Sequence, residues 1–170
     1  MRTRTLSEER ARRMKSETAA AGRVLVIGYG NPLRGDDGLG WSAANALAEA
    51  VQNDRVRIMA CIQLTPDLAE SIAQVDRVIF IDASNDLPPG QLRVERLTPA
   101  ARAEESWTHD FEPRSLLLCA QRLYGRLPEA LMITMGGASF DCRDEMSPAV
   151  RERFPLLLAR VREEIAGRAE

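Results

Sequence analysis

The sequence predicts an α/β fold, a three-layer α/β/α sandwich around a mostly parallel, twisted five-stranded sheet with one antiparallel edge strand. Two observations lead to this prediction. From Arg23 onward, short apolar runs alternate with segments of helical character, which is typical of a sheet covered by helices on both faces. In addition, the chain has 170 residues, of which 45% are hydrophobic, enough to bury one core without disulfides or metals.

Residues 1 to 22 are expected to form a flexible tail, and residues 23 to 170 a single domain. The tail is rich in arginine and ends in small residues, with no apolar face. Its glutamates, Glu8, Glu9 and Glu17, argue against an organelle transit peptide, and no apolar core of a secretory signal follows.

The first strand is expected at residues 23 to 28, followed by a helix from 37 to 52 whose small and apolar residues recur with helical spacing. The second strand is expected at residues 56 to 63. A helix from 66 to 74 follows it, because Pro66 is well suited to the first helical position.

The third strand, residues 77 to 82, is a β-branched apolar run that ends in Asp82, as a buried strand does where it emerges at the sheet edge. The turn residues 88 to 90, Pro-Pro-Gly, lead into residues 91 to 97. There polar and apolar side chains alternate, so we expect a half-exposed, antiparallel edge strand.

The second half of the chain continues the pattern. A polar loop ends at Pro113, where a helix to residue 125 is expected, and the fifth strand covers residues 130 to 135. Gly136 and Gly137 follow it and allow close approach of the backbone. Ser147 and a proline then begin an amphipathic last helix.

Composition excludes several functional classes. The net charge of −2 argues against an electrostatic nucleic-acid binder, and no apolar run approaches the ~20 residues of a membrane span. The cysteines, Cys61, Cys119 and Cys142, are odd in number and match no zinc-binding spacing. We expect them to be buried apolar residues of a cytoplasmic protein.

Residues 24 to 40, with the sequence VLVIGYGNPLRGDDGLG, form the most informative stretch. A strand that leads through a turn into a helix places that turn at the carboxyl end of the sheet, where α/β folds bind their ligands. A dinucleotide-binding turn would need glycine where Leu33 stands. A phosphate loop would need a lysine in the turn, and the chain's single lysine is Lys15.

The turn instead presents two adjacent acids, Asp36 and Asp37. One of them is expected to cap the following helix, because aspartate is favoured at a helix N-terminus. Capping does not explain both acids, so the other is expected to face a metal ion or a proton in transit.

Three side chains are expected to meet at this end of the sheet. Asp37 follows the first strand and Asp82 ends the third, and in a doubly wound sheet those two ends flank the crevice where strand order reverses. The single histidine, His109, lies in a loop that could close over the crevice. Two carboxylates and an imidazole suit nickel or zinc. The alternatives are a backbone amide satisfying Asp82 and a solvated surface position for His109.

Four stretches resemble the nickel-iron hydrogenase maturation endopeptidases: residues 28 to 40 (GYGNPLRGDDGLG), 63 to 69 (QLTPDLA), 81 to 83 (IDA) and the loop with His109. The first is long and specific, and the others follow in the family's order. The likeness extends from Arg23 over nearly the whole chain. The second stretch is similar to members that process soluble, cofactor-coupled hydrogenases.

The resemblance implies an α/β/α sandwich that removes a C-terminal extension from a hydrogenase large-subunit precursor once nickel is inserted. The family's two carboxylates and histidine fall on Asp37, Asp82 and His109, as catalytic groups and as ligands of nickel that the substrate supplies. Many members have glutamate where this chain has Asp37. Position in the motif favours Asp37 over Asp36 as the ligand.

A cytoplasmic monomer whose partner is the precursor is expected, with no nucleic-acid or membrane partner. The sequence leaves two alternatives open. One is a metal-sensing chaperone that holds the same precursor without cutting it. The other is an enzyme that acts on a small ligand in the same crevice. The chain has neither a Gly-x-Ser-x-Gly nor a His-Glu-x-x-His motif, so standard serine-hydrolase and zinc-protease arrangements are missing.

Overall fold

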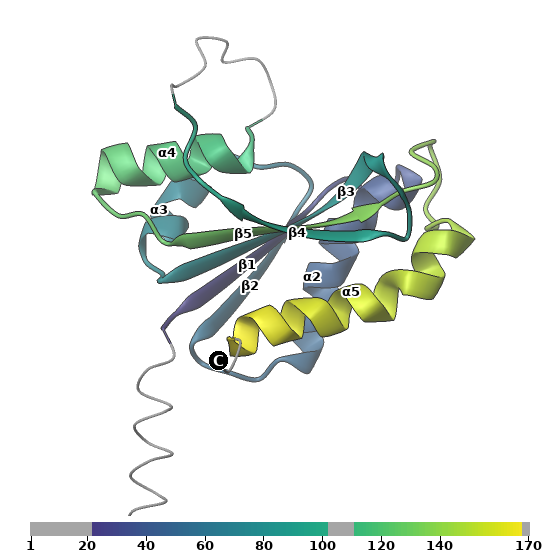
Figure 1. The fold of residues 1–170 in the computed structure, drawn as a ribbon, viewed down its shortest axis with the longest axis horizontal. Coiled ribbons are helices and arrows are strands. Elements are labelled where there is room, and N and C mark those ends of the chain that lie inside the picture. The colour runs from purple at the N-terminus through teal and green to yellow at the C-terminus, as the bar shows by residue number, and fades with distance from the viewer. Residues whose placement is uncertain (1–21, 102–110, 168–170) are drawn as a thin grey trace, which may run out of the picture.

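A computed structural model of the chain describes residues 22 to 101 and 111 to 167. In this part of the chain, five strands form one sheet in the order β2-β1-β3-β5-β4 (Figure 1). The strands are β1 (Val24–Tyr29), β2 (Val56–Cys61), β3 (Arg77–Pro89), β4 (Leu92–Leu97) and β5 (Glu129–Gly136). Neighbouring strands are parallel except β4 and β5, which are antiparallel. The predicted mostly parallel sheet with an antiparallel edge strand is therefore confirmed.

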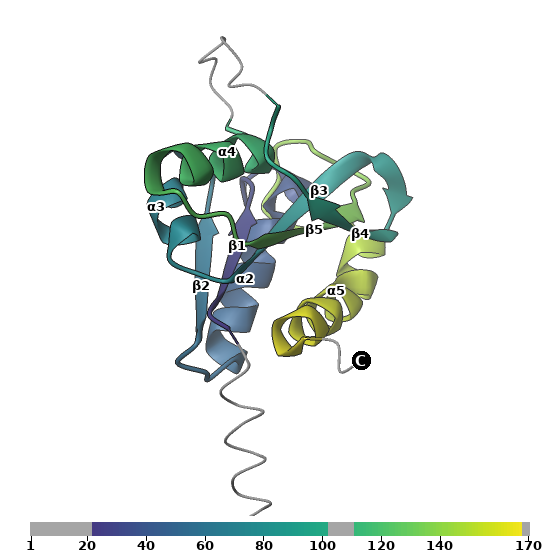
Figure 2. The same cartoon turned by 60° about the vertical axis from the view of Figure 1, so that its left-hand side comes forward.

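Helices cover both faces of the sheet (Figures 1 and 2). They are α2 (Leu39–Ala50), α3 (Leu68–Ala73), α4 (Pro113–Tyr124) and α5 (Pro148–Ala166), and a 3-10 helix, η1 (Gly35–Gly38), precedes α2. Helices α3 and α4 lie on one face and α2 and α5 on the other. This is the predicted three-layer sandwich.

The core has two parts because successive residues of a strand point to opposite faces of the sheet. In β1, Leu25 and Ile27 pack with the residues of α3 and α4, whereas Val26 packs with those of α2 and α5. All three side chains are fully buried. The near-continuous apolar strands seen in the sequence thus reflect burial on both faces.

Some element boundaries differ from the predicted ones. Strand β3 continues beyond Asp82 to Pro89, and its register on β5 shifts so that both Ser84 and Pro89 lie opposite Gly136. A side chain at Gly136 would collide with the backbone oxygen of Pro88, so glycine permits this close pairing. The helix predicted from residue 66 begins at Leu68, because the preceding residues form a turn in which Leu68 N–H donates to the Thr65 oxygen at 3.1 Å.

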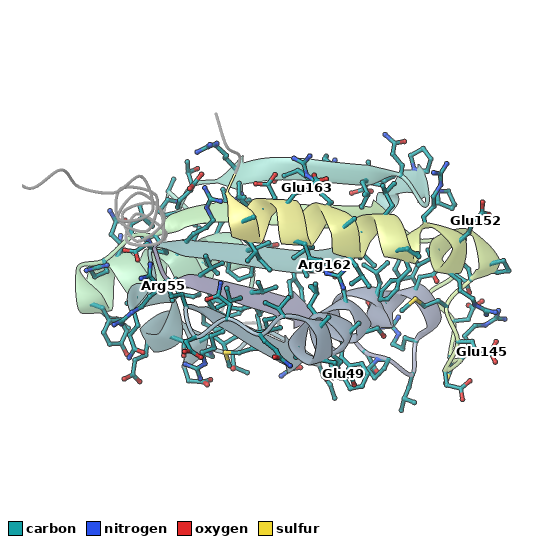
Figure 3. The ribbon with its side chains drawn as sticks, turned by 90° about the horizontal axis from the view of Figure 1, so that it is seen from below. Glu49, Arg55, Glu145, Glu152, Arg162 and Glu163 are labelled. Carbon is teal, nitrogen blue, oxygen red and sulfur yellow. The ribbon has the colours of Figure 1, made fainter. Side chains whose placement is uncertain are left out.

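The outer faces of the helices and connecting loops carry exposed charged residues of both signs. The six labelled in Figure 3 are all exposed: Glu49, Arg55, Glu145, Glu152, Arg162 and Glu163. No helix in the described ranges is both long and apolar enough to cross a membrane. The tail predicted for residues 1 to 22 lies, apart from Gly22, outside the described residues.

Candidate active site

The candidate site lies where the strand order reverses, between the carboxyl ends of β1 and β3. The chain leaves β1 for β2 on one side and then crosses to β3 on the other, so β1 and β3 are parallel neighbours. Gly28 lies opposite Ile81 in this pair, which brings the next residues, Tyr29 and Asp82, side by side at the edge. Open α/β sheets bind ligands at such a switch point.

Asp82 is half-buried at this edge and carries a strongly perturbed carboxyl group. Burial and the nearby charge of Asp37 raise its pKa from 3.8 to about 6, although hydrogen bonds from Tyr29 and from the Ala83 N–H act in the opposite direction. The Ala83 N–H donates to Asp82 Oδ1 at 2.8 Å. The structure therefore brings Asp37 and Asp82 close enough to repel each other.

Asp37 is held by the loop that follows β1. Its Oδ2 accepts a hydrogen bond from the Asn31 N–H at 2.9 Å, and Asn31 Oδ1 in turn accepts one from the Leu33 N–H at 2.9 Å. Gly30 has a φ of 130°, and a side chain there would collide with the backbone oxygen of Asp37. The glycine therefore lets the loop fold tightly enough to fix Asp37.

Asp36 has a different role. It is fully buried, and its carboxylate accepts hydrogen bonds from the backbone N–H groups of Ala138 at 2.7 Å, Ser139 at 3.0 Å and Ser147 at 2.7 Å. Burial alone would raise the pKa of Asp36, but these donors outweigh it and lower the pKa below 3.8. Asp36 thus ties η1 to the loop after β5.

The expectation that one of the two acids caps the following helix is wrong. The N-cap position of α2 is Gly38, and neither η1 nor α2 has a side-chain cap. The reason is that Asp36 is committed to the loop after β5 and Asp37 to Asn31. By contrast, Ser147 does cap α5, where its hydroxyl accepts from the Val150 N–H at 3.4 Å.

Tyr29 belongs to the site, although the sequence interpretation did not include it. Its hydroxyl is hydrogen-bonded to Asp82, and burial, followed by the charge of Asp82, raises the pKa of the phenol far above 10. Its ring packs on the core that faces α3 and α4. The strand register could have revealed it, because Tyr29 is separated from the buried Ile27 by one residue and ends the strand next to Asp82.

Cys61, the cysteine that ends β2, is not an activated nucleophile. Burial and the charge of Asp67 raise the pKa of Cys61, which keeps its thiol protonated. Cys61 and Cys119 are half-buried, but Cys142 is exposed, so the expectation of buried cysteines is wrong for Cys142. It lies in the polar loop before α5, where no core is available to cover it.

The third predicted ligand, His109, lies outside the described residues. The described chain resumes at Phe111, which packs on the core that faces α3 and α4. Glu112 is near enough to Tyr29 for its charge to contribute to the raised pKa of the phenol. Within the described ranges, no group of three His, Cys, Asp or Glu side chains could hold a metal ion.

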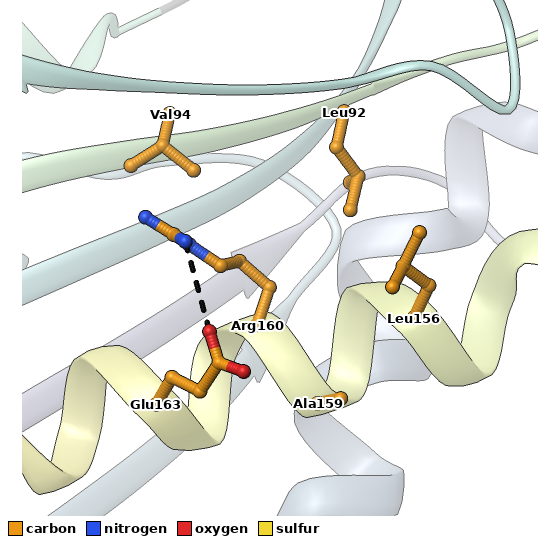
Figure 4. A pocket seen from close by; sticks show the side chains of 6 residues that line it. All are labelled: Leu92, Val94, Leu156, Ala159, Arg160 and Glu163. Carbon is orange, nitrogen blue, oxygen red and sulfur yellow. Dashed lines mark ion pairs between the residues drawn. The ribbon is translucent and has the colours of Figure 1, made fainter.

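A groove elsewhere on the molecule has no part in this arrangement (Figure 4). It lies between β4 and α5 and is lined by Leu92, Val94, Leu156, Ala159, Arg160 and Glu163. The Arg160 guanidinium pairs with Glu163 at 3.6 Å and with Glu164 at 2.6 Å. The groove contains none of the predicted site residues.

Comparison with known proteins gives a consistent picture at the level of structure. No family model and no curated protein sequence matches the chain. Among solved structures, a NiFe hydrogenase maturation protease, HycI, from Thermococcus kodakarensis is 25% identical with a TM-score of 0.70, and the match covers 90% of this chain and 97% of that one.

Two further structures agree. A hydrogenase 2 maturation peptidase from a Thaumarchaeota archaeon is 28% identical with a TM-score of 0.65, over 84% of this chain and 97% of its own. The hydrogenase maturating endopeptidase HybD from E. coli is 25% identical with a TM-score of 0.65, over 82% of this chain and 89% of its own. The similarity therefore extends over almost the whole of each solved chain.

Proposed function

We propose that the chain is a hydrogenase maturation protease, like the solved structures that it resembles, and that it removes the C-terminal extension of a nickel-iron hydrogenase large-subunit precursor after nickel insertion. The observation that carries the proposal is the pair of carboxylates, Asp37 and Asp82, at the switch point of the sheet. A protease of this family needs a polar group there to recognise its substrate and to move protons.

In this proposal, Asp37 and Asp82 contact the nickel that the precursor carries. Their donor chemistry fits a cation, because each contributes carboxylate oxygens and the two charges repel each other. One oxygen of each is occupied by a backbone N–H, from Asn31 and Ala83 respectively. The Tyr29 hydroxyl also donates to the Asp82 carboxylate. The carboxylate lone pairs that these donors do not use are left for the ion, which would neutralise the pair.

His109 is proposed as the third ligand and catalytic group. Support comes from the chain on its C-terminal side, where Glu112 lies within electrostatic range of Tyr29. Imidazole is a favoured nickel ligand, and it would complete a set of two carboxylates and one nitrogen.

The proposed chemistry is hydrolysis of one peptide bond. The substrate's nickel polarises the carbonyl or the attacking water. The protein's own part is to position the bond over Asp37 and Asp82, accept a proton at a carboxylate oxygen as water adds to the carbonyl, and return it to the leaving amine. No serine or cysteine nucleophile is required.

We further propose that the protein acts in the cytoplasm as a monomer, with the precursor as its partner and without binding nucleic acid. The net charge of −2 supports this last point, because nucleic-acid binders gather a basic excess on one face. The exposed charges labelled in Figure 3 include both signs.

The test is intact-mass spectrometry of nickel-loaded and nickel-free precursor after incubation with the protein. We expect the loaded precursor to lose its C-terminal extension and the nickel-free one to stay intact, because without the ion the extension has no anchor in the crevice. Asp37→Asn, Asp82→Asn and His109→Ala should each abolish cleavage, and serine- or cysteine-directed inhibitors should have little effect.

The outcomes separate the alternatives. Equal cutting of the nickel-free precursor would rule out nickel recognition while leaving the protease role intact. Binding of the loaded precursor without any change in its mass would favour the chaperone. Either result requires the wild-type protein to be folded, which its melting curve would establish beforehand.

A further inference from the structure

We propose that Tyr29 is a positioning residue of the site, whose hydroxyl fixes the Asp82 carboxylate in the orientation that meets the substrate's nickel. This inference rests on the proposed function. It begins from the strand register, because Gly28 opposite Ile81 places Tyr29 beside Asp82 on the same face of the sheet. The tyrosine hydroxyl is hydrogen-bonded to that carboxylate.

Asp82 needs such support because the last torsion angle of an aspartate side chain has a broad distribution, so the carboxylate rotates easily unless it is held. Two hydrogen bonds restrict it here. The Ala83 N–H donates to Oδ1 at 2.8 Å, and the Tyr29 hydroxyl, from the neighbouring strand, donates to the same carboxylate. A carboxylate bound by two donors on different strands cannot rotate without breaking one of them.

Tyr29 is itself rigid, which makes it effective as a positioning group. Its ring packs on the apolar core that includes Ile27, Leu64 and Phe80, while its hydroxyl is hydrogen-bonded to Asp82. An aromatic ring with a polar tip is suited to such a boundary between core and site. The packed core therefore fixes the Tyr29 ring, and the hydroxyl on that ring fixes the orientation of the Asp82 carboxylate.

The matched experiment uses Tyr29→Phe, with the chain's other tyrosine, in Tyr124→Phe, as the control. Tyr124 is 47% exposed on α4, and phenylalanine at either position keeps the aromatic ring. Nickel-loaded precursor is the substrate, and initial rates are measured over a range of precursor concentrations. Melting curves confirm that both variants fold.

We expect Tyr29→Phe to lower kcat roughly 10- to 100-fold with little change in KM, as for other residues that orient a metal-contacting group. Tyr124→Phe should behave like wild type. In the free protein, the Ala83 amide resonance in a nitrogen-15 NMR spectrum should shift in Tyr29→Phe and stay unchanged in Tyr124→Phe, because the same carboxylate accepts both hydrogen bonds.

A wild-type kcat for a folded Tyr29→Phe, with an unshifted Ala83 resonance, would overturn the inference and leave the proposed function standing. A rise in KM at constant kcat would also overturn it, since that pattern indicates loss of precursor binding and not of orientation. If wild type cuts no precursor, the proposed function fails, and the NMR comparison alone still decides whether Tyr29 holds Asp82.

Discussion

Asp36 shows how one residue of a motif can serve the fold while its neighbour serves the site. Its carboxylate is fully buried and accepts three backbone hydrogen bonds from the loop after β5. We expect Asp36→Asn to lose roughly 2–4 kcal/mol of unfolding free energy, because an amide nitrogen would face donors and leave at least one of them unpaired. Urea denaturation at pH 7.5 measures this loss.

The same substitution has a defined pH dependence. Because the pKa of Asp36 is lowered in the folded state, its ionised form stabilises the protein above the unfolded value of 3.8, and this contribution disappears as pH falls through the folded pKa. The difference in unfolding free energy between wild type and Asp36→Asn should therefore be present at neutral pH and shrink only in strong acid. A variant within about 0.5 kcal/mol of wild type at pH 7.5 would contradict the structural role.

Asp82 is expected to behave in the opposite way. Its pKa is raised from 3.8 to about 6, so ionising it costs the folded state. That cost is absent below pH 4, grows between pH 4 and 6, and stays constant above. We expect Asp82→Asn to stabilise the free protein at pH 7.5 by up to about 3 kcal/mol, with the gain gone near pH 3.5. Urea denaturation at both values checks this.

A loss of unfolding free energy in Asp82→Asn at neutral pH would contradict this prediction. It would show that the hydrogen bonds to the ionised carboxylate outweigh the cost of burying its charge. The expected result is a higher unfolding free energy together with lost cleavage. This is the usual trade-off, because a charge that is needed for function often costs the folded state stability. Asp36 and Asp82 therefore make a contrasting pair, in which one carboxylate stabilises the fold and the other costs it stability.

At the scale of elements, the sequence predicted what depends on local pattern. The strands and helices were found because apolar runs and helical spacing are local, and the starts of α4 and α5 because Pro113 and Ser147 mark them. The extension of β3 to Pro89 was not predicted, because it depends on the absent side chain of Gly136 in another strand. Pairing between distant segments leaves no local signal.

The same distinction between local and distant signals applies to the site. That Asp37 and Asp82 would approach each other followed from the alternation of strands and helices, which fixes where the strand order reverses. The role of Asp36 could not be predicted, because its three partners lie more than 100 residues away in the sequence. The resulting error was to assign a helix cap to one of the two acids.

Glycines account for another part of the motif that the sequence left unexplained. A side chain at Gly40 would collide with the backbone oxygens of Ile81 and Tyr29, and one at Gly28 with the backbone oxygen of Gly40. Helix α2 therefore lies directly against the ends of β1 and β3. This close contact brings η1, with both aspartates, to the strand ends.

For the whole molecule, the described domain supports a prediction about residues 1 to 20. Both faces of the sheet are covered by helices, and the first strand is anchored by Arg23, whose N–H donates to Asp76 Oδ2 at 2.8 Å. The match to the T. kodakarensis protease covers 97% of that chain but 90% of this one, so a fold of this kind needs fewer residues than this chain has.

We therefore expect a chain that begins at Ala21 to melt within about 2 °C of the full-length protein, because residues 1 to 20 have no coherent apolar face to bury and termini without one contribute little to stability. Differential scanning calorimetry of the two chains under identical conditions measures this. A matched control deletes the last two turns of α5, which include Val161, a fully buried residue of the core facing α2, and should lower Tm by many degrees. A comparable drop for the chain lacking residues 1 to 20 would mean that they pack on the domain, and the boundary at residue 22 would then have to move toward the N-terminus.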